Sequence, residues 1–214
     1  MIINKVKNMI IDLSAEIYDN MPHYPDDIDV KVSAENYEYF NITNISMCVH
    51  TATHIDTPLH CINDKDSAAS IDLNYFIGNA YCIDIIPNKD NQINFDDNFD
   101  FNIIKECSIL LINTFWHKNI NSENYYKNFP YLSKSFAYKL INLKIKTIGI
   151  DTPSVDSISN NNLIHNILFS HDICIVENIT NLEKVSNKKF FFSAAPLKIK
   201  DSEGSPVRAY AIID

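Results

Sequence analysis

Four side chains that bind metal ions or transfer protons lie within eleven residues of this sequence. The segment HTATHIDTPLH contains His50, His54, Asp56 and His60, although the whole chain has only seven histidines. Imidazole is the commonest side-chain ligand of zinc-like cations, and carboxylate is another good ligand. Burying such groups together costs desolvation energy unless a cation compensates for it. We therefore interpret His50, His54 and Asp56 as three ligands of a catalytic metal site with an open position.

Strands are expected to position most of these groups, because short runs rich in Ile, Val, Phe and Tyr recur along the chain. We predict strands at residues 9–14, 28–33, 41–50, 80–86, 108–114, 146–151, 172–179, 189–195 and 207–213. The strand at 41–50 should be half-buried and deliver His50 to its end, and Pro58 should prevent a long helix after it.

Two segments have helical patterns. Residues 133–144 (SKSFAYKLINLK) predict a helix with Ser133 as the N-cap, and residues 161–169 (NNLIHNILF) predict a shorter one after asparagine capping candidates. Because strands do not alternate cleanly with helices, we predict a strand-rich mixed α/β fold rather than a doubly wound nucleotide-binding fold. The expected architecture is a single domain, residues 1–214, with a central mixed β-sheet or barrel-like core and a few flanking helices. The polar run 87–100 should be an exposed loop within it.

Composition excludes several classes of function. The net charge of −9 and the lack of a Lys/Arg cluster disfavour nucleic acid as a partner, and three glycines are too few for a phosphate-binding loop. No apolar run approaches the length of a membrane helix, which is about 20 residues. The five cysteines have no CxxC spacing, and the opening segment lacks a signal-peptide pattern. We therefore expect a cytoplasmic protein with reduced thiols and no membrane partner.

The eleven-residue segment resembles the signature HxGTHxDxPxH of the metal-dependent cyclase family, and within it the branch of the bacterial kynurenine formamidases (arylformamidases). Ala52 stands where that family usually has glycine. The resemblance continues in order through GIDTPSVDS (149–157), a histidine in NNLIHNILF followed by ICIVENI, and PLKI with SPVRAYAI near the C-terminus. It spans most of the chain and implies the swivelling β/β/α-like fold of this family.

The resemblance also implies two divalent metal ions per subunit, most often zinc, with manganese as the alternative. The implied ligands are His50, His54, Asp56, His165 and Glu177. Asp56 would bridge the two ions. Without the resemblance, His165 would be interpreted as a hydrogen-bonded helix residue, and Glu177, within the apolar run ICIVENI, would need a cation or the chain's only arginine, Arg208.

Further roles follow from the resemblance. His60 would be the general acid/base, and Tyr24 would be a substrate-stacking aromatic at a position that is commonly tryptophan in the formamidases. A packed turn residue is the alternative for Tyr24. We expect Asp151 and Asp156 to cap turns and to brace the site from outside the ligand set. The other histidines, His23, His117 and His171, have no motif support and are interpreted as structural.

The implied activity is hydrolysis of N-formylkynurenine to kynurenine and formate by a metal-activated water, a step of tryptophan degradation. Two alternatives remain open. One is another hydrolase or dehydratase of the family that acts on a cyclic amide or another small carbonyl compound, and the other is a noncatalytic metal- or ligand-binding domain. The expected partners are a small aromatic formamide or related amide and a second copy of the chain, as a homodimer or homotetramer.

Overall fold

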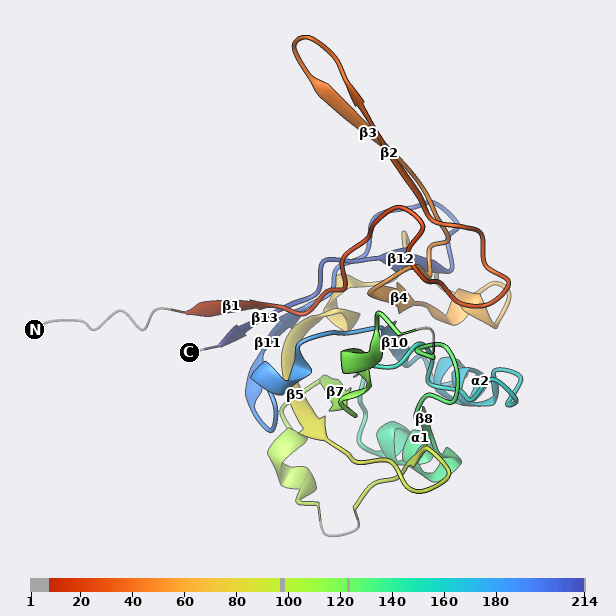
Figure 1. The fold of residues 1–214 in the computed structure, drawn as a ribbon. Coiled ribbons are helices and arrows are strands. Elements are labelled where there is room, and N and C mark those ends of the chain that lie inside the picture. The colour runs from red at the N-terminus through yellow and green to blue at the C-terminus, as the bar shows by residue number, and fades with distance from the viewer. Residues whose placement is uncertain (1–7, 97–98, 123, 214) are drawn as a thin grey trace, which may run out of the picture.

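A nine-stranded mixed sheet forms the centre of the computed structural model, which describes residues 8–96, 99–122 and 124–213 (Figure 1). Its strand order is β1 (Met9–Asp12), β13 (Tyr210–Ile213), β11 (Lys189–Ser193), β5 (Ile77–Asp84), β7 (Ile109–Asn113), β9 (Thr147–Ile150), β10 (Cys174–Glu177), β4 (His54–Asp56) and β12 (Gly204–Pro206). The strands β5, β7, β9 and β10 pair in parallel, and the outer pairings are antiparallel. The opening residues 1–7, and residues 97–98 of the predicted loop, lie outside the described residues.

The central strands β7, β9 and β10 are buried along their whole length because both faces of the sheet are covered. In β7, Ile109 and Leu111 belong to one buried cluster, and Leu110 and Ile112 belong to a second cluster on the opposite face. The first cluster also includes Ile11 of β1, at one end of the strand order, and Ile55 of β4, one strand from the other end. The sheet therefore curls around this core, which confirms the predicted mixed, barrel-like architecture.

Two α-helices of the described residues cover the outer face of the curled sheet. They are α1 (Lys134–Asn142) and α2 (Leu163–Phe169), and both contribute buried residues to the second cluster. The predicted N-cap of α1 is confirmed, since Ser133 accepts a hydrogen bond from the backbone N–H of Phe136. The predicted asparagine cap of α2 is wrong, because the Asn162 side chain makes no capping bond. The described helices include none that is long and apolar enough to cross a membrane.

Single-turn 3-10 helices connect several strands. They are η1 (Pro58–His60), η2 (Leu73–Tyr75), η3 (Phe101–Ile104), η4 (Trp116–Asn119) and η5 (Leu182–Lys184). The helix η1 begins at Pro58, whose fixed φ suits the first position of a helical turn. Within the predicted loop 87–100, β6 (Gln92–Ile93) pairs in parallel with β8 (Tyr131–Leu132).

A long hairpin projects from the rest of the molecule (Figure 1). It consists of β2 (Lys31–Asn36) and β3 (Asn41–Ser46), and every residue of β3 is exposed. The expectation that a half-buried strand over 41–50 delivers His50 is therefore wrong. That strand ends at Ser46, and the three-residue strand β4 carries the next part of the motif. Each of the other predicted strand segments overlaps an observed strand.

Candidate active site

Strand pairing brings His54, Asp56 and Glu177 to one place. Successive side chains of a strand point to opposite faces, so in β4 the apolar Ile55 enters the core while His54 and Asp56 share the other face. The antiparallel pairing of β4 with β10 sets His54 directly opposite Glu177. His54 and Asp56 therefore lie beside Glu177, which is more than 120 residues later in the chain. All three side chains are buried.

The turn before β4 requires an unusual backbone conformation. Ala52 has a φ of +56°, in the left-handed region that glycine adopts without a steric penalty. This is the position at which the cyclase signature has glycine, so the conformation explains that preference. The Ala52 carbonyl accepts a hydrogen bond of 2.8 Å from His54 Nδ1. The other ring nitrogen of His54, Nε2, therefore faces the carboxylates, and in the neutral ring it carries the lone pair that a metal ion would use.

His165 is oriented in the same way by a carboxylate. Asp156 Oδ2 lies 2.8 Å from His165 Nδ1, and the Asp156 carboxylate also accepts hydrogen bonds from the backbone N–H groups of Ile164 and His165. Asp156 therefore caps α2 in place of the predicted asparagine and, at the same time, sets the direction of the His165 ring. The ring's Nε2 lies 3.5 Å from Glu177 Oε1 and 3.8 Å from Asp56 Oδ2.

The separations between these groups fit a shared cation better than direct hydrogen bonds. His54 Nε2 lies 3.4 Å from Asp56 Oδ1 and 3.6 Å from Glu177 Oε2. Two ligands held about 2.0–2.1 Å from a tetrahedral ion are roughly 3.3 Å apart, whereas N–H···O hydrogen bonds measure about 2.7–3.2 Å. Donor atoms lie within 4.8 Å of one another in each of two groups, His50/His54/Asp56 and Asp56/His165/Glu177. The donor set therefore fits two ions with Asp56 common to both.

His50 completes the first group. Its Nδ1 lies 2.7 Å from Asp56 Oδ1, while its buried Nε2 makes no hydrogen bond among the described residues and lies 3.4 Å from Glu203 Oε1. A buried polar atom without a partner indicates a missing ligand or water. Gly204 of β12 packs against this ring, and a Cβ there would lie 2.9 Å from His50 Cε1. Glycine at this position thus lets β12 approach the site.

The carboxylates and imidazoles of the cluster shift one another's pKa values. Burial opposes protonation of His54, but the Asp56 and Glu177 carboxylates outweigh burial and raise its pKa to about 10. Burial likewise opposes protonation of His165, but its hydrogen bond to Asp156 and the nearby carboxylates of Asp56 and Glu177 outweigh burial and hold the pKa well above the usual value. Burial also opposes ionisation of Asp56, but the neighbouring imidazoliums lower its pKa well below the usual range. In the absence of a cation, protons compensate the buried carboxylates.

His60 differs from the other histidines of the motif. It lies in η1, and its ring centroid is 4.4 Å from that of His50 and 5.6 Å from that of His165. Its ring nitrogens have no hydrogen-bond partner among the residues the structure describes. Burial lowers the pKa of His60, so its ring is neutral at neutral pH and free to accept a proton.

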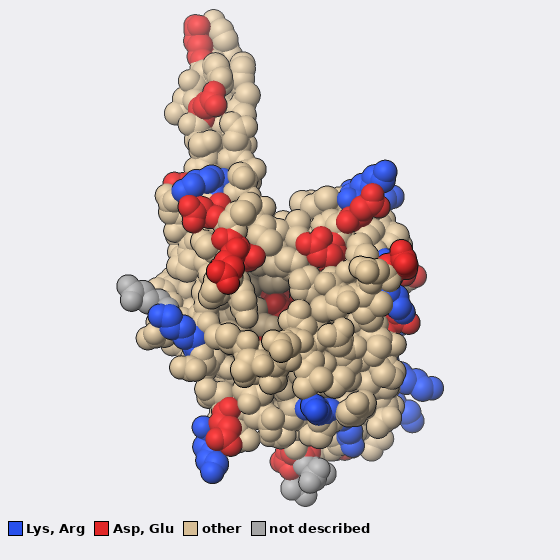
Figure 2. Space-filling model, turned by 90° about the vertical axis from the view of Figure 1, so that its right-hand side faces the viewer, with Lys and Arg blue, Asp and Glu red and all other residues tan. Residues whose placement is uncertain are grey.

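These groups line a cavity of about 240 Å³. Figure 2 shows the corresponding face, with acidic side chains recessed in a hollow below the projecting hairpin. Tyr24 and Tyr126 line the cavity and meet edge to face, with ring centroids 6.1 Å apart. Burial raises the pKa of the Tyr24 phenol. The remaining lining residues are Asp27, Pro153, Ser154, Asn162 and Asn178.

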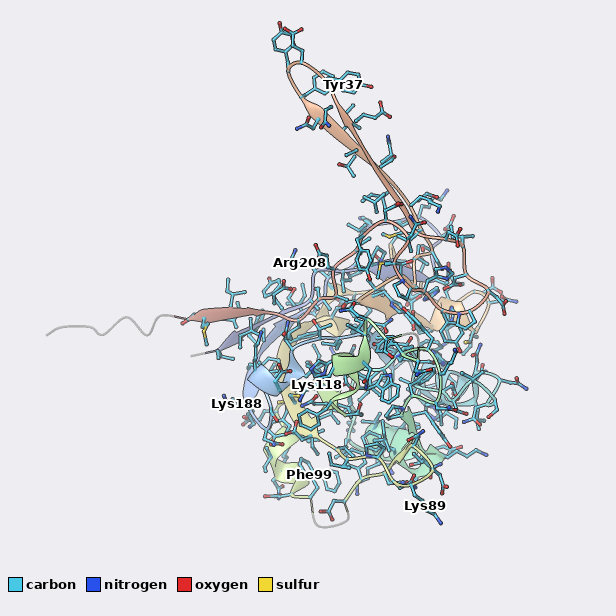
Figure 3. The ribbon with its side chains drawn as sticks, in the orientation of Figure 1. Tyr37, Lys89, Phe99, Lys118, Lys188 and Arg208 are labelled. Carbon is cyan, nitrogen blue, oxygen red and sulfur yellow. The ribbon has the colours of Figure 1, made fainter. Side chains whose placement is uncertain are left out.

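All the sequence-predicted site residues line this one cavity: His50, His54, Asp56, His60, His165, Glu177 and Tyr24. The alternative partner for Glu177 is excluded, because the exposed Arg208 (Figure 3) binds both oxygens of Asp12 at 2.7 and 2.9 Å. Asp27 and Tyr126 were not anticipated, since neither lies in a motif and only the folded chain brings them to the cavity.

The two predicted bracing aspartates differ in their contacts. Asp156 contacts the candidate ligand His165, as described above. Asp151 instead accepts hydrogen bonds from Thr114 and lies 3.0 Å from His117 Nδ1, away from the candidate ligands. His117 is buried, with its second nitrogen 2.9 Å from Glu183 Oε2, which agrees with a structural role. His23 and His171 are not among the lining residues of the cavity.

Comparison with known proteins agrees with this arrangement. Residues 11–157 match the family model described as putative cyclase. The chain is 32% identical to the kynurenine formamidase of Bacillus mycoides over 204 residues, which cover 93% of this chain and 95% of that protein. A solved structure described as a potential metal-dependent hydrolase with cyclase activity has a TM-score of 0.80 at 26% identity, covering 96% of this chain and 98% of that one.

A second solved structure supports the fold. Isatin hydrolase A from Labrenzia aggregata superposes with a TM-score of 0.82 at 22% identity, covering 96% of this chain and 94% of that one. The chain thus belongs to the cyclase family. Within that family it is a hydrolase.

We predict that replacing Asp156 by Asn weakens divalent-metal binding by about 10- to 100-fold, the usual cost of losing a carboxylate that orients a ligand histidine. Asn can still accept hydrogen bonds from the N-terminus of α2, so the fold should persist. Calorimetric titration with Zn²⁺ measures the effect. Asp151→Asn is the matched control, because it changes a buried His–Asp contact away from the candidate ligands, and it should leave the affinity unchanged. Equal affinities in both variants would contradict the orienting role.

We also predict that Zn²⁺ binding releases protons and tightens as pH rises. Because the pKa of His54 is raised to about 10, its ring carries a proton at neutral pH that a cation must displace. The competition should weaken progressively up to about pH 10. Titration calorimetry in buffers of different ionisation enthalpy counts the released protons. Binding without proton release at pH 7 would show that the imidazoles are not the ligands.

Proposed function

We propose that this hydrolase cleaves the formamide bond of N-formylkynurenine to give kynurenine and formate, a step of tryptophan degradation. One observation carries the proposal: His60 lies beside two three-residue donor groups that share Asp56, in a cavity walled by tyrosines. The 32% identity to a kynurenine formamidase over 93% of the chain supports the choice of substrate.

The proposed cofactor is a pair of divalent ions, with zinc as the first choice because imidazole and carboxylate ligands suit it. His50, His54 and Asp56 would hold one ion, and Asp56, His165 and Glu177 the other. When bound, such ions supply an activated water at neutral pH and polarise the amide carbonyl. Manganese is the alternative, because the same donors accept several divalent cations.

His60 is the proposed general acid and base. The tetrahedral intermediate of amide hydrolysis collapses to products only when the departing nitrogen is protonated, because an anilide anion is a poor leaving group. The neutral His60 ring takes a proton from the attacking water and returns it to this nitrogen. The two neighbouring imidazoles, His50 and His165, and the burial that lowers its pKa favour release of the proton.

The tyrosines position the substrate in this scheme. Tyr24 lines the cavity and is the aromatic residue proposed to stack on the substrate. Tyr126 supports it edge to face and is itself held by a hydrogen bond of 3.3 Å to the Pro22 carbonyl. An aromatic ring stacked there would exclude water from the reacting bond.

A second candidate substrate is a cyclic amide such as isatin. It is favoured by the fold shared with isatin hydrolase A and by the two positions, Ala52 and Tyr24, at which the chain departs from the formamidase pattern. The ligand groups would serve either reaction. A noncatalytic binding role is disfavoured, because such a site has no use for the proton-transferring His60.

A substrate panel separates these possibilities. Zinc-loaded protein should release formate from N-formylkynurenine faster than it opens the isatin ring, with both reactions followed by absorbance. Faster opening of isatin would replace the formamidase proposal by the second candidate. If the protein binds zinc but turns over neither compound, the result would favour the noncatalytic binding role.

We predict that His60→Ala keeps metal affinity nearly unchanged while turnover falls by about two to four orders of magnitude, the usual contribution of a general acid/base. The reason is that His60 belongs to neither donor group. Metal analysis and steady-state kinetics on the same preparation measure the two effects. His171→Ala, an exposed histidine outside the cavity, is the control. Unchanged turnover of the His60 variant would remove it from the mechanism.

We further propose that the chain forms a homodimer through the hairpin β2–β3, with a homotetramer as the larger alternative. An isolated two-stranded hairpin is at best marginally stable in water, yet this one projects into solvent (Figure 1). Near its tip, Tyr37 (Figure 3) stacks on Phe40 at 4.8 Å, and Tyr39 is 86% exposed. A second copy of the chain would cover these rings.

We predict that the double variant Tyr39→Ser/Phe40→Ser shifts the protein from dimer to monomer, because it removes apolar surface from the proposed interface. Sedimentation velocity measures the change. Leu73→Ser removes an apolar side chain that is also exposed, at 50%, but lies in η2, and should leave the dimer intact. A wild-type monomer at micromolar concentration would contradict the proposal, and so would a dimer that both changes leave intact.

A further inference from the structure

Asp27 brings a carboxylate to the cavity that the proposed chemistry does not use. It ends a turn formed by Tyr24, Pro25 and Asp26, in which the Asp27 N–H donates to the Tyr24 carbonyl at 3.2 Å. Pro at the second position and a φ of +73° at Asp26 are typical of a type II turn. The turn places Tyr24 and Asp27 together among the residues that line the cavity.

The Asp27 carboxylate has no partner within the described part of the chain. The nearby Asp29 lies 3.5 Å from His23 and 3.8 Å from Lys31. By contrast, no hydrogen bond or ion pair of the Asp27 side chain occurs among the described residues, although Asp27 is partly buried. A partly buried carboxylate gains from a cationic partner, and the position of Asp27 in the cavity wall would let a bound ligand supply one.

The surroundings of Asp27 suit an organic ammonium group. Burial is the main cause of the raised pKa of the Tyr24 and Tyr126 phenols, and the charge of Asp27 adds to it in both cases. Two aromatic rings beside one carboxylate bind an ammonium group by cation–π attraction together with a charge-assisted hydrogen bond. No Lys or Arg side chain occurs among the described residues that line the cavity.

We propose that Asp27, with Tyr24 and Tyr126, forms an ammonium-binding subsite that selects aromatic amides carrying a primary ammonium group. The inference rests on the proposed function and deepens it, because it names the feature that distinguishes a preferred substrate from a neutral aryl amide. The scissile amide lies toward the donor groups around Asp56, and the ammonium group lies toward the turn.

The test compares three formamides on the zinc-loaded protein. N-formylkynurenine carries ammonium and carboxylate groups, N-formylkynuramine carries the ammonium group alone, and formanilide carries neither. We expect Asp27→Asn to lower kcat/KM about tenfold for the first two, mainly through KM, by loss of a charge-assisted contact. Its kcat/KM for formanilide should stay within about twofold of wild type. The wild-type preference for N-formylkynuramine over formanilide should weaken with added salt.

Asp26→Asn is the matched control, because it removes the same charge one residue away from an exposed side chain that does not line the cavity. It should leave all three rates unchanged. Equal losses for all three substrates in Asp27→Asn, or no loss for any of them, would overturn the subsite.

A binding measurement at equilibrium tests the ammonium subsite independently of the proposed hydrolysis. Kynuramine should bind zinc-loaded wild-type protein about tenfold more tightly than Asp27→Asn protein, whereas aniline should not distinguish the two. If no formamide is hydrolysed but kynuramine binding depends on Asp27, the formamidase proposal fails and the subsite stands. If the formamides are hydrolysed but the Asp27→Asn change leaves kynuramine affinity unaltered, the subsite proposal is wrong and the formamidase proposal stands.

Discussion

Two buried carboxylates held beside one another are the constraint on which the site depends. Asp56 and Glu177 are 1% and 4% exposed, and they lie on neighbouring strands. Like charges in such a place are costly unless positive charge compensates for them. Three histidines surround them, and two of these have one ring nitrogen already engaged by an acceptor, so that the other faces the carboxylates. The arrangement is stable with protons and is suited to divalent cations.

The fold holds the candidate metal ligands on rigid strands and at the start of a helix. His54 and Asp56 lie on one face of β4, Glu177 ends β10, and His165 lies in the first turn of α2. The parallel strands end at the same edge of the sheet, where loops and helix starts gather. Asp156 ties α2 to the site through its backbone and side-chain contacts with His165. A donor set built from strands and a capped helix needs little reorganisation to bind ions.

The sequence predicts best what is local. The histidine motif is contiguous, and apolar runs mark the central strands, so these features follow from spacing alone. Burial depends on contacts with residues that are distant in the sequence. The alternating segment 41–50 is therefore compatible both with a half-buried strand and with an exposed hairpin strand. The surroundings of Glu177 depend on strand register, and only the fold decides between the two predicted partners, a cation and Arg208: Glu177 lies opposite His54, and Arg208 binds Asp12. The same limit applies to Asp27 and Tyr126, which reach the cavity from segments without a motif.

The most direct test of the binuclear site is a crystal structure of the zinc-loaded protein with anomalous scattering data collected at the zinc edge. We expect two anomalous peaks per chain, one among His50, His54 and Asp56 and the other among Asp56, His165 and Glu177, with the Asp56 carboxylate between them. A single peak, or peaks that do not contact Asp56, would contradict the account.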